Sequence, residues 1–229
     1  MAIPQSPTVN KEGANSTSNS GLVLALIYIT TLFFIWAFVT NLIDPLVANT
    51  KKVFTLSDAQ AQLNQFAFFI AYGVMSIPAA FYLSRKGYAN SIILGLLGII
   101  AGCLIAFSTL FTNSFTTVLL GLFVAASGIT LLQVAANPLI ASMGDPKGAA
   151  FRLNRSQSFN SMGAFIGGVV GAKYLLDGEL FAKDAVITPE LKEHGLSFVT
   201  STYVYLAIAL AVFTLAVFFV RKTIAAHAP

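Results

Sequence analysis

The sequence predicts an all-α membrane protein with six transmembrane helices, arranged as two inverted repeats of three helices. Three observations lead to this prediction. Of the 229 residues, 56% are hydrophobic and only 10% are charged, whereas a soluble domain carries about 25% charged residues. Long uncharged stretches occur, the longest between Lys86 and Asp145, and about 20 apolar residues are enough to cross a bilayer as a helix. Finally, similar polar and proline residues recur in the two halves of the chain.

The uncharged stretches indicate where each helix lies. Residues 1–20 are polar and rich in Ser, Asn and Thr, which predicts a disordered cytoplasmic tail. The uncharged block after Lys86 is too long for one helix, and the polar turn at 112–114 divides it. The long charged loop 173–197 is expected to be a solvated connector, with a short helix near residues 189–194. The predicted spans are 22–47, 59–83, 88–111, 115–138, 155–176 and 198–220, of which the fifth has the shortest uncharged part.

The positions of Lys and Arg predict the orientation, because basic residues gather on the cytoplasmic side. With a cytoplasmic N-terminus, eight of the 13 basic residues lie inside, and all four arginines are among them. We therefore expect both termini in the cytoplasm and the six-helix bundle, residues 21–222, in the inner (plasma) membrane, followed by a short cytoplasmic tail, 223–229. The net charge of +4 then belongs to a rim that faces anionic lipid headgroups, and no nucleic-acid partner is expected. The arginines are Arg85, Arg152, Arg155 and Arg221.

Asp44 is the one ionisable residue that falls clearly inside a predicted span. A charge there costs roughly 3 kcal/mol on insertion scales, so such residues usually face a bundle interior or a water-filled cavity. Thr40 and Asn41 lie one turn earlier on the same helix face, and Pro45 removes a backbone donor directly afterwards. This polar stripe predicts a cavity wall whose carboxylate holds a cation or a proton. The alternative is that Asp44 lies near the helix end and reaches the membrane surface.

Amide side chains are aligned on three further predicted helices. An amide offers both donors and acceptors, which sugar hydroxyls require, so amide-rich faces with an aromatic ring suit a neutral polyol. For any single amide, hydrogen bonding between helices explains the pattern equally well. The aligned residues are Gln62, Gln65, Phe69, Tyr72 and Ser76; Thr130, Gln133 and Asn137; and Asn154, Gln157, Asn160 and Ser161.

An internal repeat is indicated by two pairs of matching segments. Segment 41–45 ends the first span with polar residues and a proline, and segment 133–138 ends the fourth in the same way. Gln65 precedes an aromatic residue near the start of the second span, as Gln157 does near the start of the fifth. Units three spans apart have opposite topology, which is typical of transporters with a site near the membrane midplane.

Other patterns in the sequence predict close helix packing, or exclude disulfides, cysteine metal clusters and known enzyme motifs. Glycines spaced by three and four residues on the third and fifth spans favour close helix packing over a ligand role. The single cysteine, Cys103, excludes an internal disulfide and a cysteine metal cluster. We find no Walker loop, GxSxG or HExxH sequence, so no enzyme activity is expected. The glycines are Gly95, Gly98, Gly102, Gly163, Gly167 and Gly171.

Four separated motifs carry a resemblance to a known family. They are FFIWAFVTNLID at 33–44, SRKGY at 84–88, LQVAANP at 132–138 and FRLNRSQSFNS at 151–161. In this order they resemble the fucose permease and glucose/galactose transporter branch of the major facilitator superfamily, over about residues 25–172. Fucose permeases carry a glutamate where this chain has Gln133, whereas the glucose/galactose carriers have glutamine in a similar run. The resemblance therefore implies a hexose carrier closer to the glucose/galactose members.

The resemblance also implies roles for the polar residues. Asp44 would be the proton- or sodium-linked carboxylate, and no cofactor beyond that coupling ion is expected. Because family members have twelve spans in two halves, the chain would be the N-terminal half, with a second six-helix half, from another copy or another chain, as its partner. The alternative is a truncated, non-transporting membrane remnant or a scaffold subunit. The residues expected to face the sugar are Asn41, Gln65, Tyr72, Gln133, Asn137, Gln157 and Asn160.

Overall fold

The computed structural model describes residues 12–175 and 188–229, and within them the chain is helical, with no β-strand. This confirms the all-α prediction. Residues 1–11, from the predicted tail, and 176–187, from the predicted connector, lie outside the described residues. The helices are α1 (Glu12–Val53), α2 (Asp58–Lys86), α3 (Tyr88–Phe107), α4 (Thr109–Thr112), α5 (Phe115–Ser142), the short 3-10 helix η1 (Pro146–Gly148), α6 (Ala149–Leu175) and α7 (Pro189–Ala226).

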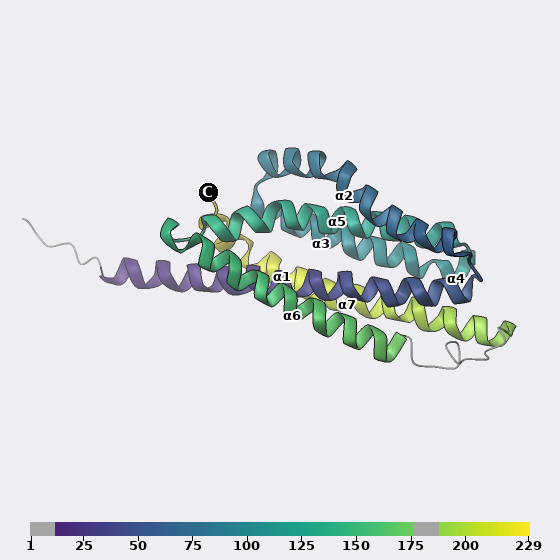
Figure 1. Ribbon diagram of the computed structural model, residues 1–229. Helices are drawn as coiled ribbons and strands as arrows, with labels where there is room; N and C mark the ends of the chain where they lie inside the picture. The colour runs from purple at the N-terminus through teal and green to yellow at the C-terminus, as the bar shows by residue number, and fades with distance from the viewer. Residues whose placement is uncertain (1–11, 176–187) are drawn as a thin grey trace, which may run out of the picture.

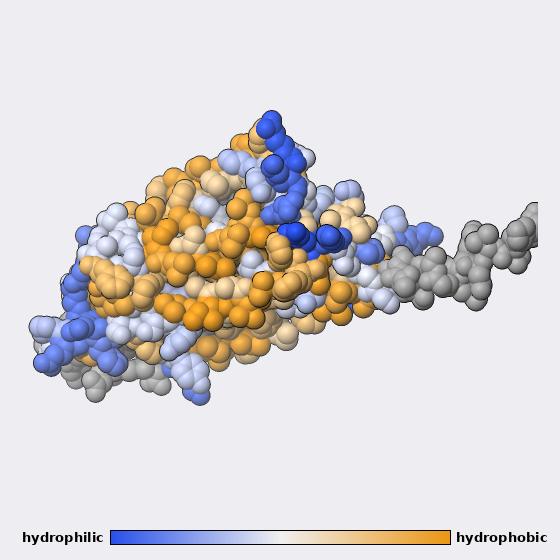
Figure 2. Space-filling view, turned by 180° about the vertical axis from the view of Figure 1, so that it is seen from behind, coloured by the Kyte–Doolittle hydropathy of each residue, from blue (hydrophilic) through white to orange (hydrophobic). Residues whose placement is uncertain are grey.

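Five of the described helices are long and apolar enough to cross a membrane. The sixth long helix, α6, has 27 residues, which corresponds to about 40 Å of helix, but it is less apolar, in keeping with its short uncharged part. Figure 2 shows a broad apolar surface over the middle of the molecule, with hydrophilic residues gathered toward both ends. These features indicate a multi-pass membrane protein.

Several helix boundaries differ from the sequence predictions. Helix α1 begins at Glu12, so it extends into the segment for which we expected a disordered tail; a helix that has formed adds one hydrogen bond for each residue it gains. The third span is interrupted at Ser108, which separates α3 from α4. The division at 112–114 is confirmed, because Asn113 adopts a left-handed conformation with φ of 48° and ends α4.

The prediction of a separate short helix near residues 189–194 is wrong. Helix α7 runs without a break from Pro189 to Ala226. Its start is well defined, since the Thr188 hydroxyl accepts a hydrogen bond from the Leu191 backbone N–H and Pro189 occupies the first turn. The charged first turns of α7 therefore continue directly into its apolar part.

The core of the bundle is built around α5, which packs against α3 on one side and α2 on another. Glycines allow the backbones of α3 and α5 to approach closely. A Cβ placed on Gly128 would lie 2.5 Å from the Gly95 carbonyl oxygen, and one placed on Gly102 would lie 2.5 Å from the Ala125 backbone nitrogen. The prediction that these glycines serve helix packing is confirmed for this pair of helices.

The same device joins α6 to α1. A Cβ on Gly167 would lie 2.6 Å from the Phe38 carbonyl oxygen, and one on Gly171 would lie 2.7 Å from the Pro45 ring. Together with Arg152, Ser156 and Gly163, these glycines form the buried stripe of α6, whose members lie four or seven residues apart and therefore on one helix face. The stripe fixes which face of α6 is turned toward α1.

The packing pattern follows the inverted repeat. If α1 corresponds to α5, α2 to α6 and α3 to α7, the pair α1–α6 maps onto α5–α2, and α1–α7 maps onto α5–α3. The pair α3–α7 maps onto itself, and all of these pairs are in contact. Figure 1 shows α2 and α6 on opposite sides of the bundle, with α1, α3, α5 and α7 between them.

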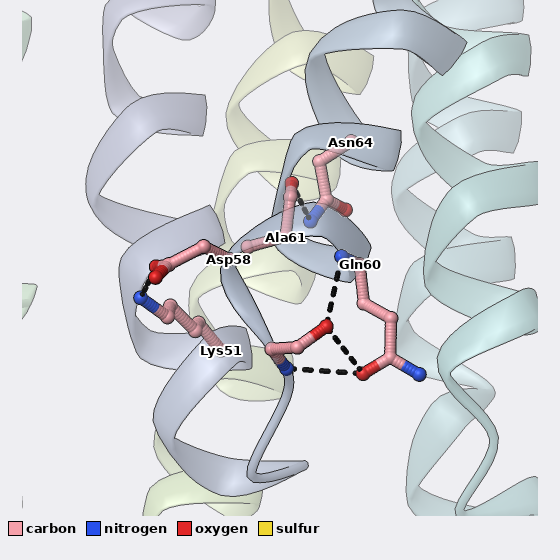
Figure 3. A network of polar contacts seen from close by, with 6 residues as sticks. Lys51, Asp58, Gln60, Ala61 and Asn64 are labelled. Carbon is pink, nitrogen blue, oxygen red and sulfur yellow. Dashed lines mark hydrogen bonds and ion pairs between the residues drawn. The ribbon is translucent and has the colours of Figure 1, made fainter.

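A polar network holds the turn between α1 and α2 (Figure 3). Lys51 near the end of α1 forms an ion pair with Asp58 at the start of α2. Ser57 caps α2, because its Oγ accepts from the Gln60 N–H at 3.3 Å while Gln60 Oε1 accepts from the Ser57 N–H at 3.0 Å. This reciprocal capping satisfies backbone donors that a helix start leaves free.

Candidate functional site

The clearest contact among the predicted site residues joins α2 to α5. Gln133 Nε2 donates a hydrogen bond to Tyr72 Oη at 3.2 Å. Tyr72 lies at the midpoint of α2 (Asp58–Lys86), and its ring packs against Phe68 with centroids 5.3 Å apart. Both Tyr72 and Gln133 are half-buried. An amide of α5 and a phenol therefore meet at the midpoint of α2.

Asn137 lies one turn after Gln133 on α5 and is also half-buried. Its Oδ1 atom is buried and has no hydrogen-bond partner among the described residues. A buried carbonyl is normally paired, so this oxygen is available as an acceptor for a ligand hydroxyl or a water molecule. The segment 133–137 thus offers amide groups beside Pro138, which lies inside α5.

The repeat-related contact, between α1 and α6, also carries an amide. Asn160 Nδ2 donates to the Phe33 carbonyl oxygen at 3.1 Å, near the middle of α6. A second bond joins Thr30 Oγ1 and Ser156 Oγ at 3.2 Å. For Asn160, the structure therefore favours hydrogen bonding between helices, the alternative that the sequence left open.

The remaining predicted residues are placed differently. Asn41 is half-buried and donates to the Ala37 carbonyl oxygen of its own helix at 2.8 Å. Gln65 is half-buried on α2, on the same face as Tyr72 and two turns before it. Gln157 is exposed, one position away from the buried stripe of α6. Asp44 lies within α1, but its side chain is outside the described part of the structure.

Arg152 has a role that the sequence analysis missed. We expected it on a basic rim, yet its side chain is only 9% exposed. Its guanidinium donates to the carbonyl oxygens of Ile140, Ala141 and Asp145 at 3.2, 2.8 and 2.9 Å. These carbonyls close α5 and the loop after it, so Arg152 caps the end of α5. The spacing of Arg152 and Ser156, which places both on the same helix face as Gly163, could have indicated from the sequence that Arg152 is buried.

Metal binding by side chains has no support in the described residues, where no group of three or more His, Cys, Asp or Glu residues lies together.

The outer faces of α2 and α6 are apolar. On α2, Phe66, Phe69 and Ile77 are exposed by 62%, 66% and 79%, and on α6 Phe165 is exposed by 72%. Such faces require lipid or another apolar protein surface around them.

The sequence matches a family and several curated proteins. Residues 24–227 match the model of the Major Facilitator Superfamily. The glucose/galactose transporter of Brucella abortus biovar 1 (strain 9-941) is 38% identical over 213 residues, which cover 93% of this chain and 49% of that protein. The L-fucose-proton symporter of Escherichia coli (strain K12) is 35% identical over 168 residues, which cover 73% of this chain and 38% of that protein. The chain thus spans about half the length of the first relatives.

Two crystal structures share the fold. One shows a Major Facilitator Superfamily transporter, FucP, in the outward conformation; its TM-score is 0.74 at 30% identity, over 87% of this chain and 50% of that chain. The other shows a variant of the E. coli fucose:proton symporter, with a TM-score of 0.73 at 28% identity, over 86% of this chain and 49% of that chain. These relatives are transporters and not enzymes, in agreement with the sequence expectation. Because the family match extends from α1 to the end of α7 and the solved transporters share the packing of these helices, this chain belongs to the Major Facilitator Superfamily.

Proposed function

We propose that this chain forms the N-terminal half of a hexose carrier that works by alternating access, with glucose or galactose preferred over fucose. The observation that carries the proposal is the meeting of Gln133 and Tyr72 at 3.2 Å beside the unpaired Asn137 carbonyl. These groups offer a sugar both hydrogen-bond donors and acceptors. The sugar preference rests on glutamine, rather than glutamate, at position 133, and on the glucose/galactose name of a relative.

The proposal includes a second six-helix half as partner. The chain spans about half the length of its relatives. In the most apolar 18-residue stretch of α2, only 17% is buried inside the bundle, whereas the corresponding value for α5 is 61%. The exposed faces of α2 and α6 are the surfaces that a second half and the surrounding lipid would share. Both termini are proposed to lie in the cytoplasm, with the bundle in the inner membrane.

The proposal assigns ion coupling to Asp44, with a proton or sodium as the coupling ion. An acidic residue within a membrane helix is costly to insert, and residues of this kind usually mark functional sites. Asp44 also directly precedes Pro45, which removes one backbone hydrogen-bond donor. Replacing Asp44 with Asn keeps the size of the side chain and removes its charge. Asp44→Asn is therefore expected to abolish gradient-driven accumulation while sugar exchange at equilibrium continues.

The test is a twelve-helix chimera in which this chain replaces the corresponding half of the Brucella abortus glucose/galactose transporter. Proteoliposomes containing it receive labelled glucose, galactose or fucose, with and without proton and sodium gradients. Saturable uptake of glucose or galactose, driven by one gradient and lost in Gln133→Leu, is expected. A folded chimera that moves none of these sugars contradicts the proposal and favours a non-transporting scaffold. The chain reconstituted alone shows whether two copies suffice.

A further inference from the structure

A small cavity lies at the end of the bundle that carries the α1–α2 turn, and it contains none of the predicted sugar-site residues. Four of its lining residues bear hydroxyl groups: Thr50 on α1, Thr109 on α4, and Thr200 and Tyr203 on α7. The rest of its wall is apolar and comes from α1, the turn after it, α3, α5 and α7. Its size corresponds to about one water molecule.

Thr109 has a hydroxyl that the surrounding helices leave unpaired. Its side chain is 1% exposed, and Oγ1 has no hydrogen-bond partner among the residues that the structure describes. A hydroxyl removed from water without a replacement bond destabilises the fold, and buried polar groups are therefore nearly always paired with protein or ordered water. The Thr109 hydroxyl needs a partner that no described neighbouring residue supplies.

The other two threonines have spare acceptor capacity. Thr50 Oγ1 donates to the Leu46 carbonyl oxygen at 2.8 Å, and Thr200 Oγ1 donates to the Leu196 carbonyl oxygen at 2.7 Å. Each hydroxyl hydrogen is thus used within its own helix, while the oxygen keeps lone pairs that accept. One unpaired hydroxyl and two oxygens able to accept therefore line the same cavity.

We propose that this cavity binds one long-lived water molecule. The water accepts a hydrogen bond from the Thr109 hydroxyl and donates its two hydrogens to the oxygens of Thr50 and Thr200. Three bonds are the usual number for a buried water. The site joins the end of α1, the short helix α4 and the first part of α7, so the water completes the packing of three segments that are far apart in the sequence.

The first experiment uses NMR of the chain in lipid nanodiscs, with threonine methyl groups labelled. Magnetisation transfer from a long-lived water to the methyl groups of Thr50, Thr109 and Thr200 is expected. Thr130 serves as an internal reference, because it is buried on α5 and its hydroxyl already donates to the Ala126 carbonyl oxygen at 2.8 Å. If the methyl group of Thr109 receives no magnetisation from water, as is expected for Thr130, the proposal is overturned and no variant is needed.

The second experiment compares Thr109→Val with Thr109→Ser. In a hydrated cavity the valine removes one bond of the water, so the ratio of folded to unfolded protein is expected to fall about fivefold in an SDS titration. The serine keeps the hydroxyl and is expected to keep water transfer at Thr50 and Thr200. In a dry cavity valine only removes an unpaired hydroxyl, and Thr109→Val as stable as the parent, or more stable, overturns the proposal. Thr130→Val is the matched control for losing a threonine hydroxyl that is already paired.

Discussion

Tyr72 and Gln133 meet across two helices through one hydrogen bond, and that bond fixes the direction of the Gln133 amide. Its Nε2 faces Tyr72, which leaves Oε1 as the acceptor for a sugar hydroxyl in the proposed site. We therefore propose that Tyr72 positions Gln133 in that site. A side chain that is held in place in this way binds with less loss of conformational freedom.

We predict that Tyr72→Phe raises the KM of the chimera for glucose about fivefold, the value of one hydrogen bond, and leaves the maximal rate nearly unchanged. Initial uptake rates over a range of glucose concentrations measure both quantities. Tyr82→Phe, a half-buried tyrosine later on α2, is the control and is expected to match the parent. A KM for Tyr72→Phe equal to that of the parent rules out the positioning role.

Arg152 acts on stability instead. Its three hydrogen bonds close α5, and bonds from a charged donor are stronger than neutral ones. Arg152→Met is expected to lower the free energy of unfolding by about 3 kcal/mol, measured by SDS titration in detergent micelles. Arg155→Met removes an exposed arginine three residues later and is expected to change the free energy of unfolding by less than about 0.5 kcal/mol. Equal effects of the two substitutions contradict the capping role.

At the scale of the helices, the glycines of α3 and α5 allow direct backbone contact. We predict that Gly128→Ala destabilises the fold by about 1–3 kcal/mol, because the new Cβ would lie 2.5 Å from the Gly95 carbonyl oxygen and the backbones must separate. Gly73→Ala on α2 is the matched control, since nothing lies within 4 Å of a Cβ there. It is expected to stabilise by about 0.5–1 kcal/mol through helix propensity. Measurements of the free energy of unfolding check this account: Gly128→Ala is expected to lower it and Gly73→Ala to raise it.

The long helices were predictable because apolar length and charge placement are properties of the sequence alone. The turn at Asn113 was predictable too, since its polar residues interrupt an uncharged block. The break at Ser108 and the continuous start of α7 were not, because polar residues at such positions are equally compatible with helix and turn. Local hydrogen bonds, such as the cap at Thr188, decide between the two.

The candidate site was predictable only in part. Spacing shows which residues share a face of one helix, so Gln65 and Tyr72 were grouped correctly. It does not show which helix lies opposite, so the Tyr72–Gln133 bond was not foreseen. The buried stripe of α6 through Ser156 and Gly163 turns Gln157 outward within the chain, and its expected role of facing the sugar stays a prediction.

For the whole molecule, the proposed orientation has a direct test. Cys103 is buried and is the single cysteine, so Cys103→Ala gives a background without thiols. Thr116→Cys at the start of α5 and Asn90→Cys at the start of α3 then place exposed thiols at opposite ends of the bundle. A membrane-impermeant maleimide is expected to label Thr116→Cys in intact spheroplasts, and Asn90→Cys only after lysis. The reverse pattern shows that the proposed orientation is wrong.

The glycine contacts of α6 also determine where this half of the molecule can deform. At Gly163 and Gly167 the backbone of α6 lies directly on the backbone of α1, with no side chain between them that could change rotamer, so we expect these two helices to tilt as one stiff body. In the repeat-related pair, α2 has no such glycine contact at Gly73, and the glycines of α5 face α3 instead. Side chains separate α2 from α5 there, and rotamer changes are less costly than backbone displacement. We therefore expect relative tilting of the helices to be taken up at the α2–α5 contact, where Tyr72 and Gln133 meet.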